Sequence, residues 1–435
     1  MIVVRNPLLL FVLAGAVPAQ GKTDYLADVK SAIDAIEQQC KVLLASKKID
    51  WKKVTAPLLA ESKKVKADDA HLLLLWRLLA RLQDGHAEVR PLAKGQGVKL
   101  TVPERTYGPG LFLCQSGGKV YVKNVWGPAQ GVGLEPGMEV LTIAGAPAAQ
   151  WLAKRTAELA DVTSFSTSQH ATFFTCHQGL ADVAGTRLEV EFKDGAAKKK
   201  RTIDYGKVNQ TPPGPAFPPE GLKGERDVFY GTTKGGAGYV HVRRCKDDLP
   251  AQLDEALQAL GDVPGLILDF RGNSGGGCDH EAVFGRFLPP GTKWRGGVEY
   301  TSAGPRPYGG PIVVIVDATV RSTGETVSGM FGEDGRAFVI GESATAGMSS
   351  QKTTIDLPSG LFALYVSVAS NKARFQGGKG LEGVGYAPHE VVPLAPADLL
   401  AKRDTLIVRA EALLADFPKG KVRYDPKQAG WPGGK

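Results

Sequence analysis

The 435-residue sequence lacks the signatures of several common kinds of site. Its five cysteines include no C-x-x-C pair and its seven histidines form no H-E-x-x-H pattern, so we expect no metal centre. The glycine-rich stretch that ends at Gly277 is not followed by G-K-[ST], which argues against a phosphate loop. We therefore predict neither a nucleotide nor another cofactor. Beyond the first twenty residues, no apolar run is long enough to cross a membrane.

Basic residues exceed acidic ones, and the formal net charge is +8. The charge is spread along the chain except for the run KKKR at residues 198–201. No aromatic residues are interleaved with this run, so we interpret it as a solvated hairpin loop and predict no nucleic-acid partner. The hydrophobic content of 43% and charged content of 23% are typical of a globular protein, and the length allows two or three domains.

Residues 1–19 have the pattern of a signal peptide. Arg5 precedes an apolar stretch at residues 8–17, and Val17 and Ala19 fit the small-residue rule for cleavage before Gln20. A single-pass anchor is the alternative, and the uncleaved segment would then be the part that associates with a membrane. We expect an exported protein, periplasmic or extracellular. Disulfides are allowed there, but their pairing cannot be read from the sequence.

The organisation of the chain is predicted from changes in periodicity. Helical spacing dominates the first part, short strands follow, and strand and helix signals then alternate as in a parallel sheet with covering helices. Residues 396–417 have the pattern of one last amphipathic helix. We divide the chain into a signal peptide at 1–19, an N-terminal helical domain at 20–95, a small β-rich domain with an insertion at 96–205, a linker at 206–224, an α/β core at 225–400, and a C-terminal helix and tail at 401–435.

Ser322 lies between an apolar run at residues 311–316, which indicates a buried strand, and a segment with a helical pattern. A helix N-terminus at that point could present N–H groups to a developing oxyanion, and the serine would then be a nucleophile. Serine is also a common helix cap. From this segment alone, both roles remain open.

The β-rich segment resembles a PDZ domain. The matching series is Gly133, Leu134, Gly137, Val140, Ile143 and Gly145. A PDZ groove adds a peptide as an extra strand and binds its terminal carboxylate through N–H groups. The resemblance implies a carboxylate loop and a substrate-pairing strand at Gly110, Leu111, Phe112 and Leu113.

The predicted strand at residues 266–270 ends in RGNSGGG, which resembles the RGNxGG motif of the S41 serine peptidases. That family includes carboxyl-terminal processing proteases, the tricorn protease core and interphotoreceptor retinoid-binding proteins. The resemblance extends over nearly all of the mature chain and implies a core of the crotonase/ClpP type. It implies oxyanion donors at Thr323 and at Gly275 or Gly276.

Two branches of this family use different bases. In the processing proteases the nucleophile lies three positions before a Glu, which matches Ser322 and Glu325. Their lysine lies four positions before a Gln; Gln351, which we assign to substrate binding, is present here, but the lysine position holds Gly347. The resemblance therefore does not support a Ser–Lys dyad. Lys352 is near in sequence, although a neighbouring strand position need not face the same way.

The tricorn branch uses Ser, His and Glu. The stretch QDGHAEV provides a match at His86, and LEGVGYAPHEV provides one at Glu382, with His389 in place of the usual Asp. The resemblance implies that Ser322 is the nucleophile, His86 the base, and Glu382 the group that orients His86. Taken alone, His86 could be a helix cap and Glu382 a solvated side chain.

The resulting hypothesis is an exported serine endopeptidase that acts on unfolded or C-terminally presented protein substrates. The alternative is a catalytically inactive peptide- or lipid-binding protein on a peptidase-derived fold. An acyl-CoA enzyme of the crotonase type would share a similar core, but it would not explain the N-terminal helices or the PDZ-like segment. The sequence does not indicate an oligomeric state.

Overall fold

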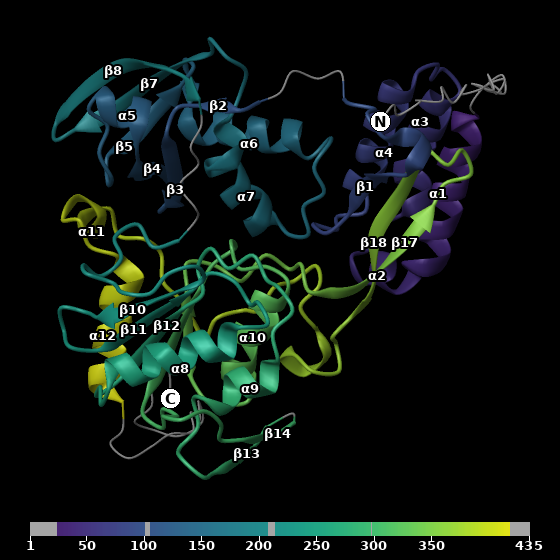
Figure 1. Ribbon diagram of the computed structural model, residues 1–435. Coiled ribbons are helices and arrows are strands. Elements are labelled where there is room, and N and C mark those ends of the chain that lie inside the picture. Colours follow the sequence, from purple (N-terminus) through teal and green to yellow (C-terminus); the bar gives the residue numbers. More distant parts are fainter. Residues whose placement is uncertain (1–23, 101–104, 208–213, 297, 418–435) are drawn as a thin grey trace, which may run out of the picture.

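The computed structural model describes residues 24–100, 105–207, 214–296 and 298–417, which form three domains (Figure 1). The fold is mixed α/β, as predicted, and the expected signal peptide at 1–19 lies outside the described residues. Within these ranges, no helix combines the length and the apolar character that a membrane span would need.

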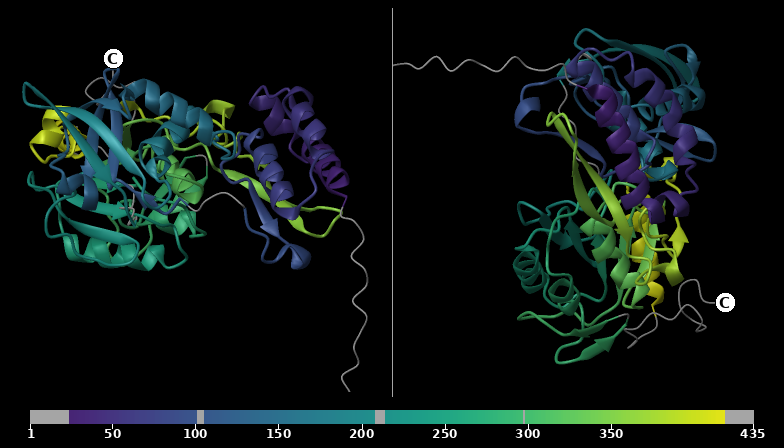
Figure 2. Two further views of the ribbon diagram at one scale, coloured as in Figure 1. Left: turned by 90° about the horizontal axis from the view of Figure 1, so that it is seen from above. Right: turned by 90° about the vertical axis from the view of Figure 1, so that its right-hand side faces the viewer.

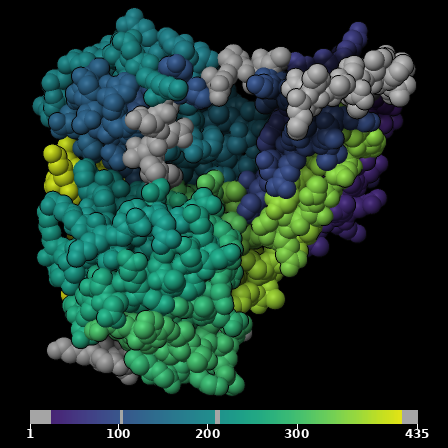
Figure 3. All heavy atoms as spheres, viewed as in Figure 1, coloured from purple at the N-terminus to yellow at the C-terminus, as the bar shows by residue number. Residues whose placement is uncertain are grey.

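The N-terminal domain combines residues 24–100 with a hairpin at 350–370 that extends to it from the core (Figures 1 and 3). Its apolar side chains form one buried cluster shared by the helices and the hairpin. The hairpin belongs to this domain because Ile355, Leu364 and Val366 are buried in that cluster. The elements are α1 (Tyr25–Gln39), α2 (Lys41–Ser46), α3 (Trp51–Ser62), α4 (Asp68–Ala80), β1 (Glu88–Pro91), β17 (Ser350–Asp356) and β18 (Phe362–Ser370), with sheet order β1-β18-β17.

The middle domain, residues 105–207, is a sheet of order β3-β4-β5-β7-β8 with β6 beside β5. Strand β3 is at the sheet edge and contacts helix α7. The elements are β2 (Tyr107–Gly108), β3 (Leu111–Ser116), β4 (Lys119–Val125), α5 (Gly127–Gly131), β5 (Glu139–Ile143), β6 (Ala146–Pro147), α6 (Ala148–Leu159), α7 (Ser168–Cys176), β7 (Arg187–Asp194), β8 (Ala197–Asp204) and β9 (Gly206–Lys207).

The basic run at residues 198–201 is not a hairpin loop, and that prediction was wrong. These residues lie inside β8 and pair with β7, while the turn falls earlier, at residues 195–196. Most of β8 is exposed, with Ile203 its buried position, so a strand is compatible with consecutive lysines. Lysines on an edge strand also discourage pairing with another chain.

The core domain, residues 214–349 and 371–417, contains the predicted parallel sheet. Its order is β10-β11-β12-β15-β16-β19, parallel from β11 onward. Helices α8, α9 and α10 pack on one face, and α11 and α12 on the other (Figure 2). The elements are β10 (Val228–Thr232), β11 (Gly238–Val242), α8 (Leu249–Leu260), β12 (Leu266–Asp269), α9 (His280–Gly285), β13 (Lys293–Arg295), β14 (Glu299–Thr301), β15 (Ile312–Val316), α10 (Thr323–Glu333), β16 (Phe338–Gly341), β19 (Glu390–Val391), α11 (Pro396–Leu400) and α12 (Thr405–Asp416).

The predicted single helix at residues 396–417 is in fact two helices, α11 and α12. Asp404 separates them: its carboxylate accepts the N–H groups of Leu406 and Ile407 and also pairs with the buried Arg271. A capping side chain stabilises a helix start rather than a helix interior, so the chain breaks here despite its amphipathic pattern.

Candidate active site

Ser322 lies at the N-terminus of α10, after the carboxyl end of β15. Its backbone has φ 56° and ψ −130°, which is strained for a residue with a side chain. An ordinary capping serine has an extended backbone instead. A strained serine between a strand and a helix is the conformation that exposes a nucleophile in other hydrolases. Ser322 also forms capping-box contacts with Glu325 at the start of α10, so the structure is compatible with both roles.

Glu325 holds the start of α10 against residues 345–348. Its buried carboxylate accepts hydrogen bonds from the Thr345 hydroxyl (2.5 Å) and from the N–H groups of Gly347 and Met348 (both 2.7 Å). It also accepts the N–H of Ser322 at 3.2 Å. Burial raises the pKa of Glu325 to about 8. This side chain thus positions the serine rather than reacting itself.

Gly347, at the position of the processing-protease lysine, has no room for a side chain. Its φ is +78°, and an added Cβ would lie 2.6 Å from the side chain of Thr167 in the middle domain. The missing lysine is therefore a consequence of how closely the middle domain packs here.

The glycine loop after β12 lies directly against the serine. A Cβ added at Gly275 would lie 2.7 Å from the Cβ of Ser322. The N–H of Gly275 donates to Asn273 Oδ1 at 2.8 Å, so this predicted oxyanion donor is already engaged. The Thr323 hydroxyl donates to the Gly276 carbonyl at 2.5 Å. The amides of Gly276 and Thr323 are therefore the better candidates for the oxyanion site.

A buried ion network fixes the base of this loop. The Arg271 guanidinium lies 2.6 Å from Asp269 Oδ2 and 2.9 Å from Asp404 Oδ2, and all three side chains are almost fully buried. Asn273 Nδ2 donates to the Val242 carbonyl at 2.9 Å. Every charge in the network is paired, which is the condition for a buried ion cluster to be tolerated.

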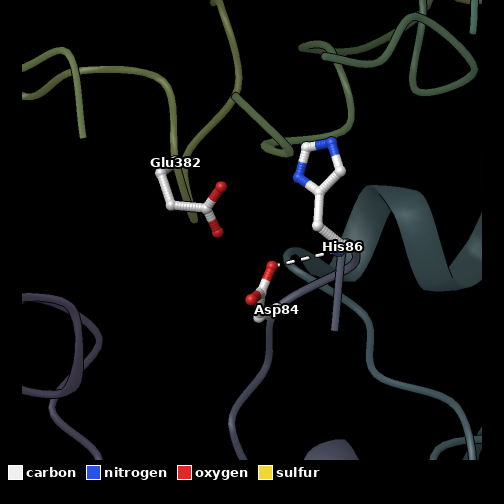
Figure 4. Close-up of side chains that lie close together, drawn as sticks. All are labelled: Asp84, His86 and Glu382. Carbon is white, nitrogen blue, oxygen red and sulfur yellow. Dashed lines mark hydrogen bonds between the residues drawn. The ribbon is translucent and has the colours of Figure 1, made fainter. Parts of the chain in front are cut away.

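His86 and Glu382 are brought together from opposite ends of the chain (Figure 4). Polar side-chain atoms of Asp84, His86 and Glu382 all lie within 4.8 Å of one another. His86 Nδ1 and Glu382 Oε2 are both buried without a hydrogen-bond partner among the described residues. A small side-chain rotation would join these two atoms and satisfy both of them.

Lys47 and Ser166 complete the surroundings of Glu382. Lys47 Nζ lies 2.9 Å from Glu382 Oε1 and donates to the Gln83 carbonyl at 2.6 Å. The Ser166 hydroxyl lies 3.4 Å from the same carboxylate oxygen. Burial raises the pKa of Glu382 to about 7, whereas Lys47 acts to lower it. The sequence analysis missed both residues, because neither lies in a motif and both contacts cross domain boundaries.

Asp84, His86 and Glu382 are spaced closely enough to hold a metal ion, but protein groups engage most of their carboxylate oxygens. Asp84 accepts the N–H of Ser367 (2.7 Å), the Ser367 hydroxyl (2.9 Å) and the N–H of His86 (3.0 Å). Lys47 already supplies a positive charge to Glu382. Both Asp84 oxygens and Glu382 Oε1 are thus engaged by protein donors, which leaves Glu382 Oε2 to face the imidazole.

Met348 lies next to both Ser322 and Gly85, the residue before His86. A Cβ added at Gly85, next to His86, would lie 2.7 Å from the Met348 side chain. The Met348 carbonyl accepts the N–H of Ser322 at 3.1 Å. Met348 therefore contacts Ser322 through its carbonyl and lies with its side chain against the residue that precedes His86.

Lys352, whose side-chain direction the sequence left open, also lies at this site. With Ser322, Thr323 and Gln351 it lines a cavity of about 260 Å³. The β17–β18 pairing is irregular between Gln351 and Lys352, and such irregularities redirect side chains. Burial, followed by the charge of Lys352, lowers the pKa of His86 to about 4. His86 is therefore a neutral imidazole at physiological pH.

His389 has a structural role in β16. The ring Nδ1 of His389 accepts the backbone N–H of Val339 at 2.9 Å. The backbone N–H of His389 donates to the Val339 carbonyl at 2.8 Å. The residue that departs from the expected motif thus extends the sheet edge and does not enter the site.

The predicted substrate-pairing segment enters the edge strand of the middle domain. Gly110 has φ +70°, and Leu111, Phe112 and Leu113 are buried in β3. Phe112 and Arg321 line one hollow between α7 and the core. Leu113 lines a second hollow of about 270 Å³, which is lined by the same strand and helix. A groove between β3 and α7 therefore leads toward the residue before Ser322.

Comparison with known proteins is consistent with this geometry. Residues 236–392 match the model of peptidase family S41. Tricorn protease homolog 2 of Streptomyces coelicolor is 25% identical over 244 residues, which cover 55% of this chain and 20% of that protein. The chain thus spans about a fifth of that relative's length.

Two solved structures share the fold. Mature CPAF complexed with lactacystin has a TM-score of 0.65 at 12% identity, over 90% of this chain and 98% of that one. A protein described as a peptidase from Parabacteroides merdae has a TM-score of 0.50 at 15% identity, over 91% of this chain and 99% of that one. Identities this low support the fold alone.

Residues 236–392 are therefore similar to the peptidase domain of family S41, whose members are serine-type hydrolases. Within that class, the chain is similar in sequence to a tricorn protease homologue.

Proposed function

We propose that this protein is a serine endopeptidase in which Ser322, His86 and Glu382 act as nucleophile, base and orienting acid. The observation that carries the proposal is the strained backbone of Ser322, held against the glycine loop and hydrogen-bonded to Met348, whose side chain lies against the residue before His86. Strain of this kind persists where the surrounding structure enforces it, and it is concentrated at functional sites.

The chemistry follows from the protonation states. The neutral imidazole of His86 takes the Ser322 hydroxyl proton as Oγ bonds to the peptide carbonyl carbon. His86 Nδ1–H then donates to Glu382 Oε2, which stabilises the imidazolium. Returning the proton to the leaving nitrogen breaks the C–N bond, and water releases the acyl group in a second round. The Gly276 and Thr323 amides would stabilise the oxyanion.

We further propose that the middle domain is PDZ-like and binds an extended segment of the substrate in the groove between β3 and α7. The free edge of β3 can accept main-chain hydrogen bonds from an added strand. Binding there would raise the local concentration of the substrate near Ser322. We also propose that the protein is exported, on the basis of residues 1–19.

The groove can be tested without removing the domain, whose Ser166 contacts Glu382. Thr172→Trp places a large side chain in the hollow lined by β3 and α7. We expect slower cleavage of long substrates and unchanged labelling of Ser322 by a small fluorophosphonate. Ala153→Trp, on an exposed position of α6, is the matched control. Equal cleavage of long substrates by both variants would exclude a tethering role.

The proposed function is tested by Ser322→Ala in the purified protein, with unfolded casein as substrate. We expect hydrolysis to fall by at least about a thousandfold, as when a nucleophile is removed. Ser328→Ala, in the same helix, should retain activity. Wild-type hydrolysis by folded Ser322→Ala protein would refute the assignment.

A further inference from the structure

Two cysteines lie side by side at the base of the glycine loop. The N–H of Cys278 donates to the Cys245 carbonyl at 2.9 Å, and the N–H of Cys245 donates to the Gly275 carbonyl at 3.0 Å. A parallel bridge also pairs Cys245 with Gly276. The backbone thus brings together two residues that are remote in sequence, next to the glycine that contacts Ser322.

The two thiols contact each other and differ in reactivity. The Cys245 thiol donates to Asn273 Oδ1 at 3.6 Å, and it also shares a hydrogen bond with the Cys278 sulfur. This bond lowers the pKa of Cys278 and raises that of Cys245 well above its ordinary value. Cys245 is fully buried, whereas Cys278 is 7% exposed and lies between the exposed Gly277 and Asp279. Cys278 is therefore the sulfur that an incoming reagent meets first, with Cys245 behind it.

The other three cysteines have raised pKa values, in contrast to Cys278. Cys114 and Cys176 both line the hollow beside α7, and burial raises the pKa of Cys176 to about 12. The pKa of Cys114 is raised as well. Burial also raises the pKa of Cys40 to about 12. Unlike Cys278, none of these three thiols has a lowered pKa that would let it begin disulfide exchange as a thiolate.

We propose that Cys245 and Cys278 form a dithiol–disulfide site at the glycine loop, oxidised by a small disulfide compound. The Cys278 thiolate attacks one sulfur of the reagent, forms a mixed disulfide and releases one reagent thiolate. Cys245 then loses its proton and attacks the Cys278 sulfur, which forms the Cys245–Cys278 bond and releases the second reagent thiol. The protein loses two hydrogens, and the reagent is reduced to two thiols.

The bond would tie the segment after β11 to the loop that contacts Ser322. Because the backbones are already hydrogen-bonded, closing the bond requires little rearrangement of the loop. We therefore expect oxidation to raise the thermal-unfolding midpoint by several degrees and to change fluorophosphonate labelling of Ser322 by less than about threefold. The site does not depend on the proposed peptidase activity, since its formation is detected by mass.

The test is to incubate the folded full-length protein with oxidised glutathione, block free thiols with N-ethylmaleimide in denaturant, and map the peptides. We expect loss of two of the five free thiols, a peptide linking Cys245 to Cys278, and reversal by dithiothreitol. Cys245→Ser should instead accumulate glutathione on Cys278, whereas Cys40→Ser should still form the link.

A link between Cys114 and Cys176 in place of the expected one would overturn the proposal. So would five alkylated thiols after prolonged incubation. If Cys245→Ser does not fold, the peptide map of the wild-type protein still decides between these outcomes.

Discussion

His86 Nδ1 and Glu382 Oε2 are two buried polar atoms that find no hydrogen-bond partner in the part of the chain that the structure describes. Polar atoms of these two residues lie within 4.8 Å of each other. Leaving both unsatisfied costs about 1–3 kcal/mol per atom. Burial and the charge of Lys352 keep the imidazole neutral, and its Nδ1 lies on the side of Glu382 (Figure 4). A protonated imidazole would be stabilised by the adjacent carboxylate, which is the electrostatic requirement of a catalytic base.

Replacing Lys47 by Met should impair the ability of Glu382 to accept a hydrogen bond from His86. Without the ammonium 2.9 Å away, the pKa of Glu382 should rise above about 7, and the protonated acid cannot accept a proton from His86. Losing a charge-assisted hydrogen bond costs about 1.5–3 kcal/mol, so we expect kcat/KM to fall roughly tenfold to a hundredfold at pH 7. The loss should shrink as the pH rises and Glu382 ionises.

The measurement for Lys47 is the pH profile of kcat/KM. Lys47→Arg should restore part of the activity, because it keeps the charge. Lys52→Met, which removes a largely exposed lysine, is the control. A uniform loss at every pH would indicate a structural role for Lys47 rather than an effect on Glu382.

Replacing Lys352 by Met should raise the pKa of His86. A nearby positive charge disfavours the imidazolium, so removing it should move this pKa upward from about 4, by roughly one unit. Histidine NMR titration of Ser322→Ala protein measures the shift, with the His86 signal identified by its loss in His86→Ala. Lys379→Met, at an exposed position, should leave the pKa unchanged. A fall in the His86 pKa would contradict the electrostatic arrangement.

Gly275→Ala should displace the nucleophile. The new Cβ would lie 2.7 Å from Ser322 Cβ, and φ is +87° at this position. We expect kcat/KM to drop at least about a hundredfold, because small misplacements of reacting groups are costly. At Gly277 an added Cβ meets only Asp247 Oδ1, at 3.7 Å, so Gly277→Ala should be nearly as active as wild type. Similar activity in the two variants would show that Gly275 is not needed to seat Ser322.

The buried pair Lys123–Glu342 should hold the middle domain to the core. The two charged atoms are 2.7 Å apart, and both side chains are almost inaccessible. Lys123→Met leaves Glu342 unpaired and should destabilise the protein by about 3–5 kcal/mol in urea unfolding. The double variant, Lys123→Met with Glu342→Gln, should recover at least half of the lost free energy of unfolding. If the double variant loses as much free energy of unfolding as the two single variants together, the two residues do not interact in solution.

The sequence was sufficient for features that are encoded locally. The apolar runs predicted the parallel strands, and the RGNSGGG motif predicted a tight loop at the end of β12. Family motifs also singled out His86 and Glu382, which the structure places near each other. Their catalytic roles remain predictions.

Features that depend on packing between domains could not be predicted in this way. Lys47 and Ser166 reach Glu382 from the N-terminal and middle domains, and no local pattern marks either residue. The hairpin at 350–370 has strand periodicity, but nothing in its sequence says which sheet it joins. The commitment of the Gly275 amide to Asn273 likewise depends on the folded loop.

The central claim, that His86 activates Ser322, is tested most directly by fluorophosphonate labelling followed by peptide mapping in the wild type, His86→Ala and Lys352→Met. We predict stoichiometric labelling at Ser322 in the wild type, labelling slowed by at least about a thousandfold in His86→Ala, and labelling within about tenfold of wild type in Lys352→Met. Labelling that persists in folded His86→Ala protein and disappears in Lys352→Met would contradict the account and assign the base to Lys352.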